Sequence, residues 1–244
     1  TFENVSYTYE DTNIQALDNI SFTINKGETV AIMGKTGSGK STILSLLTRI
    51  HDVTGNSKIK IDGHNLTEYD LYHLRNSMSI VPQDPFLFSD SIKNNIKFGK
   101  EDATAEEIIT AAKMAVVDDN IQSFTNKYET ILGERGITLS GGQKQRVSIA
   151  RAIIKEAPIL ILDDCLSAVD TETEEKIVNN FKKIFNKKTT IIVTHRASAA
   201  KNANKIIVLD SGRIVQEGTH NQLVNQEGFY KDLYTKQLSE KENA

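Results

Sequence analysis

The sequence has no tryptophan, three prolines and one cysteine, Cys165, among its 244 residues. A single cysteine excludes an internal disulfide framework and favours a reducing compartment. No apolar run approaches the roughly 18 residues that a membrane-spanning helix needs. With 29 basic and 32 acidic residues the net charge is −3, so the basic excess of a general nucleic-acid binder is missing. The chain begins without Met or a signal peptide, and we expect it to be a piece of a longer protein.

What is present is a globular composition, with 39% hydrophobic and 25% charged residues. Apolar alternation or short apolar runs predict strands at 5–9, 20–24, 29–33, 58–62, 79–81, 159–162, 190–194, 205–209 and 213–215, the last after a Ser211-Gly212 turn. Helical patterns cover 40–50, 144–155, 171–185 and 219–237, and the interval 85–158 is mostly helical. Capping boxes are predicted at Thr104/Glu107 and Thr171/Glu174. This alternation predicts an α/β fold with a mostly parallel sheet, an antiparallel β cap and an inserted helical lobe.

Residues 34–41 read GKTGSGKS and match the pattern G-x-x-x-x-G-K-[ST] in full. The segment follows a predicted strand and opens a predicted helix, which is the context that this phosphate loop requires. Its glycines let backbone N–H groups point at phosphate oxygens, and the helix N-terminus adds positive potential. Lys40 is expected to place its charge on the terminal phosphates, and the hydroxyl of Ser41 suits a Mg²⁺ ligand. The predicted phosphate-binding residues are Lys35, Thr36, Gly37, Ser38, Gly39, Lys40, Ser41 and Thr42.

Asp163 stands at the carboxyl end of the predicted strand 159–162. Ligands of open α/β sheets bind at that edge, and a carboxylate there can hold Mg²⁺. Taken alone, Asp163 would suit an acidic helix cap better, but the phosphate loop favours the metal role.

A second glycine-rich segment, LSGGQ at 139–143, precedes the predicted helix 144–155. Ser140 supplies a hydroxyl, and Gly141 and Gly142 expose backbone N–H groups at another helix N-terminus. The chain therefore carries two phosphate-binding devices that a single nucleotide need not use together. In their order and spacing, the phosphate loop, LSGGQ and the Asp163 strand resemble the ATPase domains of ABC transporters, and the resemblance covers about 2–238.

The resemblance implies a P-loop NTPase core of RecA-like type, with an N-terminal antiparallel β subdomain and an inserted α-helical subdomain. We expect the core and β subdomain to comprise residues 1–84 and 158–244, and the helical subdomain to comprise about 85–157. The transmembrane domain of such a transporter is absent from this chain.

Further positions match the family's motifs in order. Tyr9 resembles the aromatic residue that stacks on adenine, although it could simply pack on a sheet. Gln83 resembles the Q-loop glutamine, a Mg²⁺ ligand, although a surface turn would also suit it. Asp170, in SAVD at 167–170, resembles the D-loop residue that crosses to a partner domain. His195 resembles the switch histidine that contacts the γ-phosphate, and its place after a parallel strand favours that role over a structural one.

The remaining histidines have no such support, and we expect them to be solvated. They are His51, His64, His73 and His220.

In this family two ATPase domains pair head to tail, and each ATP lies between one phosphate loop and the opposite signature. The resemblance therefore implies ATP-dependent dimerisation. The nucleotide-contacting set then includes Ser140, Gly141, Gly142, Gln143 and Asp170.

Two segments resemble exporters rather than importers. Residues 130–136 (TILGERG) resemble the X-loop, which touches the intracellular helices of the transmembrane part, and 84–89 (DPFLFS) has the exporter pattern after the Q-loop. The run 86–88 could be core, but if exposed it would suit docking of a coupling helix. The implied protein is a multidrug or lipid exporter, with this domain on the cytoplasmic side of the cell membrane and touching the membrane only through the missing part.

One position departs from the family pattern. Asp164 stands where the family has the glutamate that orients or deprotonates the attacking water. Its oxygens fall short by roughly 1.5 Å, and a misplacement of about 1 Å can cost on the order of 100-fold in rate. We expect slow hydrolysis at this chain's own phosphate loop. The catalytic set is Asp164, His195, Lys40 and Gln83.

Two interpretations follow from Asp164. The chain is either the degenerate half of a heterodimeric exporter, which the run DDCLSAVD at 163–170 resembles, or a slower homodimeric ATPase. The retained His195 counts against the first interpretation, because some degenerate halves lose it. Cys165 has no basic cluster near it in sequence and is expected to be a small buried residue.

An ATP-dependent clamp with negligible turnover is kept open by Asp164. An ABC-type ATPase acting on nucleic acid or ribosomes is disfavoured, because 42–139 has no sustained heptads and only one ATPase domain is present. The favoured function is binding and hydrolysis of ATP with Mg²⁺, with a second ATPase domain and the coupling helices as partners and no nucleic acid.

Overall fold

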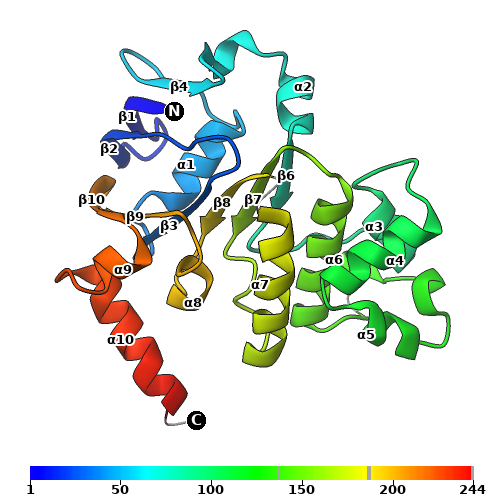
Figure 1. Cartoon of the computed structure of the whole chain (residues 1–244). Helices are drawn as coiled ribbons and strands as arrows, with labels where there is room; N and C mark the ends of the chain where they lie inside the picture. The colour runs from blue at the N-terminus through cyan, green and yellow to red at the C-terminus, as the bar shows by residue number, and fades with distance from the viewer. Residues whose placement is uncertain (137, 186–187, 243–244) are drawn as a thin grey trace. The chain divides into compact units, whose positions relative to one another are not determined.

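The computed structural model describes residues 1–136, 138–185 and 188–242 (Figure 1). The chain forms two compact units. The first contains Thr1–Met78 and Thr189–Ala244, and the second contains Ser79–Lys188.

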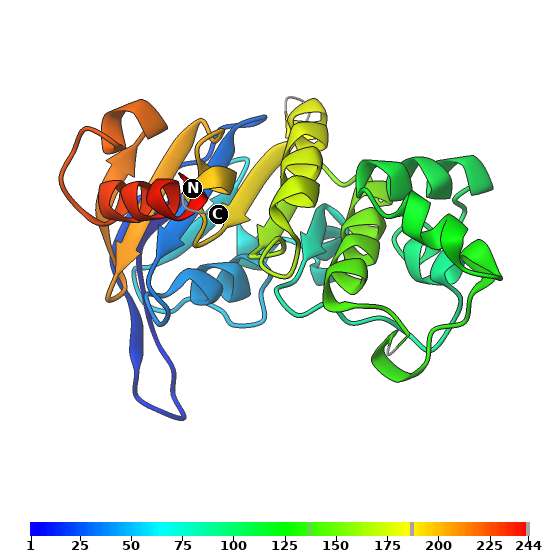
Figure 2. The same ribbon diagram turned by 90° about the horizontal axis from the view of Figure 1, so that it is seen from below.

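The first unit begins with an antiparallel sheet in the strand order β2-β1-β4-β5. Its strands are β1 (Phe2–Thr8), β2 (Gln15–Phe22), β4 (Lys58–Ile61) and β5 (His64–Asn65), followed by a 3₁₀ turn at Leu66–Glu68 and helix α2 (Leu71–Asn76). β1 pairs with β2 on one side and with β4 on the other. Figure 2 shows the β1–β2 hairpin, in dark blue, extending away from the other strands of this unit.

The same unit contains a second, mostly parallel sheet in the order β10-β9-β3-β8. β3 (Thr29–Gly34) is parallel to β8 (Thr189–Val193) and β9 (Lys205–Asp210), whereas β10 (Arg213–Gly218) is antiparallel to β9. All six residues of β3 are buried, which explains its continuous apolar sequence. The helices of the unit's second half are α8 (Ala197–Ala200), α9 (His220–Leu223) and α10 (Phe229–Glu242).

Helix α1 (Lys40–Leu47) follows β3 directly and is shorter than the predicted 40–50. The predicted single helix at 219–237 is instead two helices. α9 ends at Leu223, and Gly228, with φ +139°, precedes α10. A backbone conformation of that kind interrupts helical geometry, so one continuous helix cannot form there.

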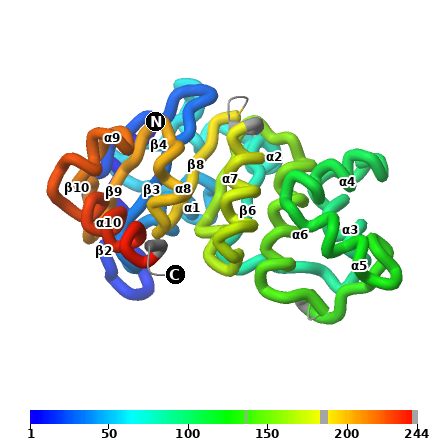
Figure 3. Tube along the Cα trace, turned by 60° about the horizontal axis from the view of Figure 1, so that its bottom comes forward, coloured from blue at the N-terminus to red at the C-terminus, as the bar shows by residue number. Residues whose placement is uncertain are grey.

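The second unit contains β6 (Met78–Val81), of which Ser79–Val81 belong to it, and β7 (Ile159–Asp163), which neighbour one another in the sheet. Its helices are α3 (Ile92–Lys97), α4 (Ala105–Met114), α5 (Asp118–Ser123), α6 (Gly141–Ile154) and α7 (Thr171–Phe185), with 3₁₀ turns at Lys127–Glu129 and Glu134–Gly136. α6 packs against both α3 and α4, and Figure 3 shows α3 to α6 gathered together. The whole interval 85–157 lies inside this unit.

The two predicted capping boxes have different outcomes. At α4 the prediction is confirmed, because Thr104 Oγ1 accepts from the Glu107 N–H at 3.2 Å and Glu107 Oε2 accepts from the Thr104 N–H at 2.7 Å. At α7 the prediction is wrong. The carboxylate of Asp170, one residue earlier, accepts from the Thr173 N–H at 2.9 Å. An ionised carboxylate is the stronger acceptor at a helix N-terminus, and this hydrogen bond lowers the pKa of Asp170.

Candidate nucleotide-binding site

The phosphate loop connects the buried strand β3 to helix α1. Gly34, Gly37 and Gly39 have φ values of +147°, +79° and +103°. A Cβ on Gly34 would stand 2.2 Å from the carbonyl oxygen of Leu209, and one on Gly39 would stand 2.5 Å from that of Ala16. A Cβ on Gly37 would meet no atom within 4 Å. The loop is therefore closed on its inner side and open at Gly37, where a phosphate group could approach the backbone.

The turn between β9 and β10 contacts the phosphate loop through a backbone hydrogen bond. The Gly212 N–H donates to the carbonyl of Ser38 at 3.2 Å, and the Gly212 carbonyl accepts from the Asp18 N–H at 2.9 Å. The predicted Ser211-Gly212 turn is confirmed, since Arg213 pairs with Asp210 across it. Sequence patterns give no sign that this turn also supports the phosphate loop.

Lys40 bends back over the loop that precedes it. Its Nζ donates to the carbonyls of Gly34 and Lys35, both at 2.8 Å, and lies 3.4 Å from Ser38 Oγ. The ammonium group is half-buried and is held above the curled backbone. Its position fits a group that neutralises phosphate charge at the same place.

The neighbouring predicted residues also lie at this loop. Ser41 is exposed, whereas Thr42 is buried and its Oγ1 lies 3.1 Å from the hydroxyl of Tyr9. Tyr9 follows the last residue of β1 and is held by the hairpin turn, since its N–H donates to the carbonyl of Ile14 at 3.0 Å and its carbonyl accepts from the Asn13 N–H at 2.8 Å. The structure thus brings Tyr9 to residues 35–42, as the sequence prediction requires.

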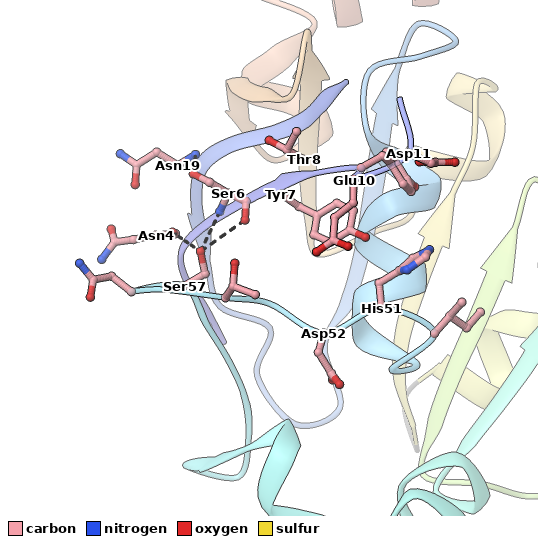
Figure 4. Close-up of a pocket in the computed structure, with 14 residues that line it drawn as sticks. Asn4, Ser6, Tyr7, Thr8, Glu10, Asp11, Asn19, His51, Asp52 and Ser57 are labelled. Atoms are coloured by element: carbon pink, nitrogen blue, oxygen red, sulfur yellow. Dashed lines mark hydrogen bonds between the residues drawn. The ribbon is translucent and has the colours of Figure 1, made fainter. Parts of the chain in front are cut away.

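Tyr9 borders a cavity of about 1210 Å³ that opens beside β1 (Figure 4). The Tyr9 ring stands edge-on to the rings of Tyr7 and His51, at centroid distances of 5.0 and 5.5 Å. Burial is the largest cause of the raised pKa of Tyr7. The expectation that His51 is simply solvated is wrong, because it is half-buried against two tyrosine rings. The one signal in the sequence for this burial is that His51 comes soon after the helix that follows the phosphate loop.

His195 lies at the same sheet edge as the phosphate loop. The Thr194 N–H donates to the carbonyl of Ile32 at 3.2 Å, and His195 follows with an exposed side chain. Its position after β8, beside β3, agrees with the predicted placement at the carboxyl end of a parallel strand.

The expectation for His220 is wrong, because its Nδ1 lies 2.7 Å from the hydroxyl of Tyr230 and burial lowers its pKa. His64 and His73, in contrast, are exposed as predicted, with ring side chains 71% and 81% accessible.

The second unit carries the other predicted site residues. Gln83 is exposed after β6, and the buried Gln145 of α6 donates from Nε2 to the carbonyl of Pro82 at 3.0 Å, which fixes the backbone just before it. Asp163 ends β7 and is half-buried. Asp164 is half-buried with φ +44°, a conformation that aspartate tolerates better than most residues. The role of Gln145 is not visible in the sequence.

Cys165 is buried, as predicted, with 3% of its surface exposed. Burial, together with the charge of Asp164, raises the pKa of its thiol, so the thiolate form is disfavoured. The residue belongs to the hydrophobic core.

The LSGGQ segment starts helix α6, which begins at Gly141 rather than at the predicted 144. Ser140 Oγ accepts from the Gln143 N–H at 3.3 Å, and Gln143 Oε1 accepts from the Ser140 N–H at 2.9 Å. A Cβ on Gly142 would stand 2.8 Å from the carbonyl of Ala168, so glycine there lets the D-loop pack against the helix start. Gly141 is exposed and its N–H is one of the helix's first.

Comparison with known proteins identifies the family. The profile described as ABC transporter matches residues 17–167. The chain belongs to the ABC transporter family.

This ABC ATPase domain is similar to several named proteins. It is 48% identical over 96% of its length to "Putative multidrug export ATP-binding/permease protein YgaD" of Bacillus subtilis (strain 168), covering 40% of that protein. It is 45% identical over 98% of its length to the "ATP-dependent lipid A-core flippase" of Idiomarina loihiensis, covering 41% of that protein. The chain thus spans about two fifths of the length of these relatives.

A solved structure described as a bacterial Atm1-family ABC exporter with ATP bound has a TM-score of 0.93 and 40% identity. It matches 98% of this chain and 42% of its own. These findings confirm the predicted P-loop fold and the ABC ATPase domain of exporter type, which binds nucleotide. None of the helices in the described ranges is long and apolar enough to cross a bilayer.

The predicted metal ligands of the ABC domain are Ser41, Gln83 and Asp163. Among the described residues, no group of three or more His, Cys, Asp and Glu side chains could hold a metal ion. A hydroxyl, an amide oxygen and one carboxylate nevertheless fit Mg²⁺, which keeps several waters and binds substrate phosphates. Ser41 belongs to the first unit and the other two residues to the second.

The segment after the Q-loop divides between core and surface. Leu87 is fully buried, whereas Phe86, Phe88 and Phe98 are 53%, 38% and 67% exposed. We call these three exposed rings the aromatic patch. Phe88 stands 5.2 Å from Phe86 and 4.7 Å from Phe98, centroid to centroid. Of the two alternatives for 86–88, core packing therefore holds for Leu87, and surface exposure holds for Phe86 and Phe88.

Arg151 of α6 holds the aromatic patch in place. Its guanidinium lies 5.4 Å from the Phe88 ring centroid and 5.6 Å from that of Phe98. It also donates to the carbonyls of Phe86 and Asn95, each at 2.8 Å. Burial lowers its pKa to about 10, and it stays charged at neutral pH.

Proposed function

We propose that this domain binds Mg-ATP at its phosphate loop and hydrolyses it in a head-to-tail dimer that powers export. The observation that carries the proposal is the presence of two phosphate-binding devices on one chain. One is the glycine-constrained loop under Lys40, and the other is the exposed start of the 14-residue helix α6 at Ser140. If each nucleotide contacts the loop of one domain and the α6 start of its partner, both devices are used.

Within this proposal each residue has a chemical role. Lys40 neutralises charge on the terminal phosphates, and the Tyr9 ring stacks on adenine beside the cavity. Ser41, Gln83 and Asp163 hold Mg²⁺, which would supply charge neutralisation at the transferred phosphoryl group. His195 contacts the terminal phosphate from the edge of the parallel sheet.

Asp164 is proposed as a weak base at this chain's own site. Its carboxylate has the charge needed to orient water but lacks one methylene of reach. We therefore propose that this domain is the slow half of a heterodimer, with an intact LSGGQ that serves the partner's site. The slow homodimer is the competing arrangement.

The aromatic patch is proposed as the docking surface for a coupling helix of the transmembrane part. Three exposed rings fixed by Arg151 form an apolar surface, and the X-loop residue Ile131 is 63% exposed. We propose accordingly that the domain works on the cytoplasmic side of the cell membrane. The names of the relatives suggest a drug or a lipid as cargo, whose selection would lie in the transmembrane part.

The test is steady-state Mg-ATP turnover of this chain beside its Asp164→Glu variant, over a range of protein concentrations. We expect slow wild-type turnover and a rise on the order of 100-fold in the variant, increasing with concentration. Asp164→Glu combined with Lys40→Ala is the control and should be silent. Equal, ordinary rates for wild type and variant would contradict the slow-site proposal and favour a homodimer. Dimerisation with ATP but no turnover in any variant would favour a clamp.

A further inference from the structure

The loop that carries His195 is held by side chains on two sides. On the inner side the hydroxyl of Thr194, itself buried, accepts from the Arg196 N–H at 3.0 Å. On the outer side lies Gln237 of helix α10, far along the chain. Its Nε2 donates to the carbonyl of His195 at 3.1 Å, and its Oε1 accepts from the Ala197 N–H at 2.8 Å.

The two hydrogen bonds of Gln237 have a specific geometry. An amide side chain offers one acceptor and one donor at a fixed separation, and here each meets a backbone group on either side of Arg196. The Ala197 N–H opens helix α8, whose N-cap position has no side-chain cap of its own. Gln237 therefore caps α8 from outside and holds the carbonyl of His195 in the same contact.

Helix α10, which carries Gln237, is fixed to the fold near its N-terminus by Tyr230. Tyr230 is fully buried, its N–H donates to Gln216 Oε1 at 3.2 Å, and its hydroxyl contacts His220. Gln237 comes seven residues later, two helical turns on and therefore on the same face as Tyr230. α10 lies beside α8, as Figures 2 and 3 show. The helix is thus anchored at one end and reaches the His195 loop with the other.

We infer that Gln237 is a positioning residue for His195. The inference rests on the proposed role of His195 at the terminal phosphate. By fixing the backbone on both sides of Arg196, Gln237 keeps the His195 ring at the sheet edge where that phosphate would lie. The C-terminal helix α10 then takes part in setting the rate of hydrolysis.

The kinetic test uses Gln237→Met, which keeps the side chain's length but neither hydrogen bond. It is made in the Asp164→Glu background so that turnover is measurable. We expect kcat to fall roughly 10- to 100-fold, because a displacement of about 1 Å carries a cost of that order, while KM for ATP changes little. The neighbouring exposed Thr235→Ala is the matched control on the same helix and should leave kcat unchanged.

A double-mutant comparison separates positioning from general loss of structure. In a His195→Ala background, Gln237→Met should lower kcat no further, because the group that it positions is gone. An equal fall in both backgrounds would overturn the inference.

A spectroscopic arm distinguishes this inference from the proposed function. Histidine ring signals of the nucleotide-free chain are recorded by NMR, and the His195 signal is assigned by its loss in His195→Ala. Gln237→Met should shift or broaden it, and Thr235→Ala should not. If the chain fails to turn over ATP, this arm still decides the matter, and an unmoved His195 signal overturns the inference. If Gln237→Met does not fold, Gln237→Glu, which keeps the acceptor to Ala197 and loses the donor to His195, replaces it.

Discussion

Backbone carbonyls decide where the phosphate loop tolerates a side chain. Gly34 and Gly39 face the carbonyls of Leu209 and Ala16, which cannot move as a flexible side chain would. The motif identifies these glycines from the sequence, but not the atoms that constrain them. Those atoms belong to strands 23 or more residues away, and only folding brings them to the loop.

The cost of a methyl group should therefore differ between two glycines of one loop. Gly34→Ala should destabilise the domain by on the order of 3 kcal/mol, since it adds a clash with backbone to a left-handed conformation. Gly37→Ala, with the same kind of φ but open space around it, should cost only about 1 kcal/mol. Urea unfolding of both variants measures the difference. Equal losses would show that conformation alone, and not the Leu209 carbonyl, sets the requirement.

Individual side chains were harder to predict than motifs. The residues of the phosphate loop and Tyr9 are brought together as the sequence indicates, because motif spacing and sheet order fix their positions. His51 and Gln237 were not anticipated as neighbours of the site. Each reaches it through tertiary contacts, with tyrosine rings or a loop backbone, that leave no periodic pattern in the sequence.

Helix ends show which local signals are decisive. A Thr–Glu pair predicts the start of α4 correctly, yet the same pattern is wrong at α7, where Asp170 provides a better acceptor. α6 starts at Gly141 despite two glycines of low helix propensity, because Ser140 and Gln143 cap it reciprocally. The parallel strands β3, β8 and β9 were predicted to within one residue, since buried strands such as β3 are continuous apolar runs. The antiparallel strands were not, because β1 and β2 begin three and five residues before the predicted 5–9 and 20–24.

The start of α4 should make the domain sensitive to acid. The Lys100 ammonium and then the Thr104 N–H lower the pKa of Glu107 from 4.5 to about 2. A carboxylate with a depressed pKa in the folded state stabilises the fold above pH 4.5, and this contribution is lost as pH falls toward 2. In Glu107→Gln the free energy of unfolding should therefore fall less than in the wild type as the pH drops from 5 to 3.

Urea unfolding at a series of pH values makes that measurement. Glu106→Gln, at the preceding exposed position of the same turn, is the control and should retain the wild-type pH dependence. An unchanged slope in Glu107→Gln would show that the Lys100 contact is too exposed to matter.

At the scale of the whole molecule, motifs and packing divide the chain differently. The motifs predict a helical subdomain at about 85–157, whereas the second compact unit also contains β7 and α7. α7 packs on α4, and Asn180 donates from Nδ2 to the carbonyl of Met114 at 3.0 Å. Such contacts join segments from different motifs, and so the sequence motifs alone do not reveal the extent of a packed unit.

The proposed head-to-tail dimer makes a prediction about association. Mg-ATP should convert the chain from monomer to dimer, and Mg-ADP should not. Ser140→Arg, at the exposed start of α6, should weaken this dimerisation at least about 10-fold while leaving binding of ATP to its own phosphate loop intact. Analytical ultracentrifugation and a fluorescent ATP analogue measure the two properties.

The control for that experiment is Ser123→Arg, which places the same charge at an exposed serine of α5. It should dimerise like the wild type. Unaltered dimerisation of Ser140→Arg would contradict a partner-facing signature segment.

The tip of the β9–β10 hairpin has a practical consequence for anyone labelling such a domain. Surface hairpin tips are ordinarily the preferred places for an epitope tag, a fluorescent protein or a circular-permutation break. Here the Gly212 N–H donates to the carbonyl of Ser38 and the Gly212 carbonyl accepts from the Asp18 N–H. A reporter inserted between positions 211 and 212 would therefore disturb the phosphate loop that these contacts support. The loop at 54–57 is no better a place for the reporter, because Thr54, Asn56 and Ser57 line the cavity that Tyr9 borders.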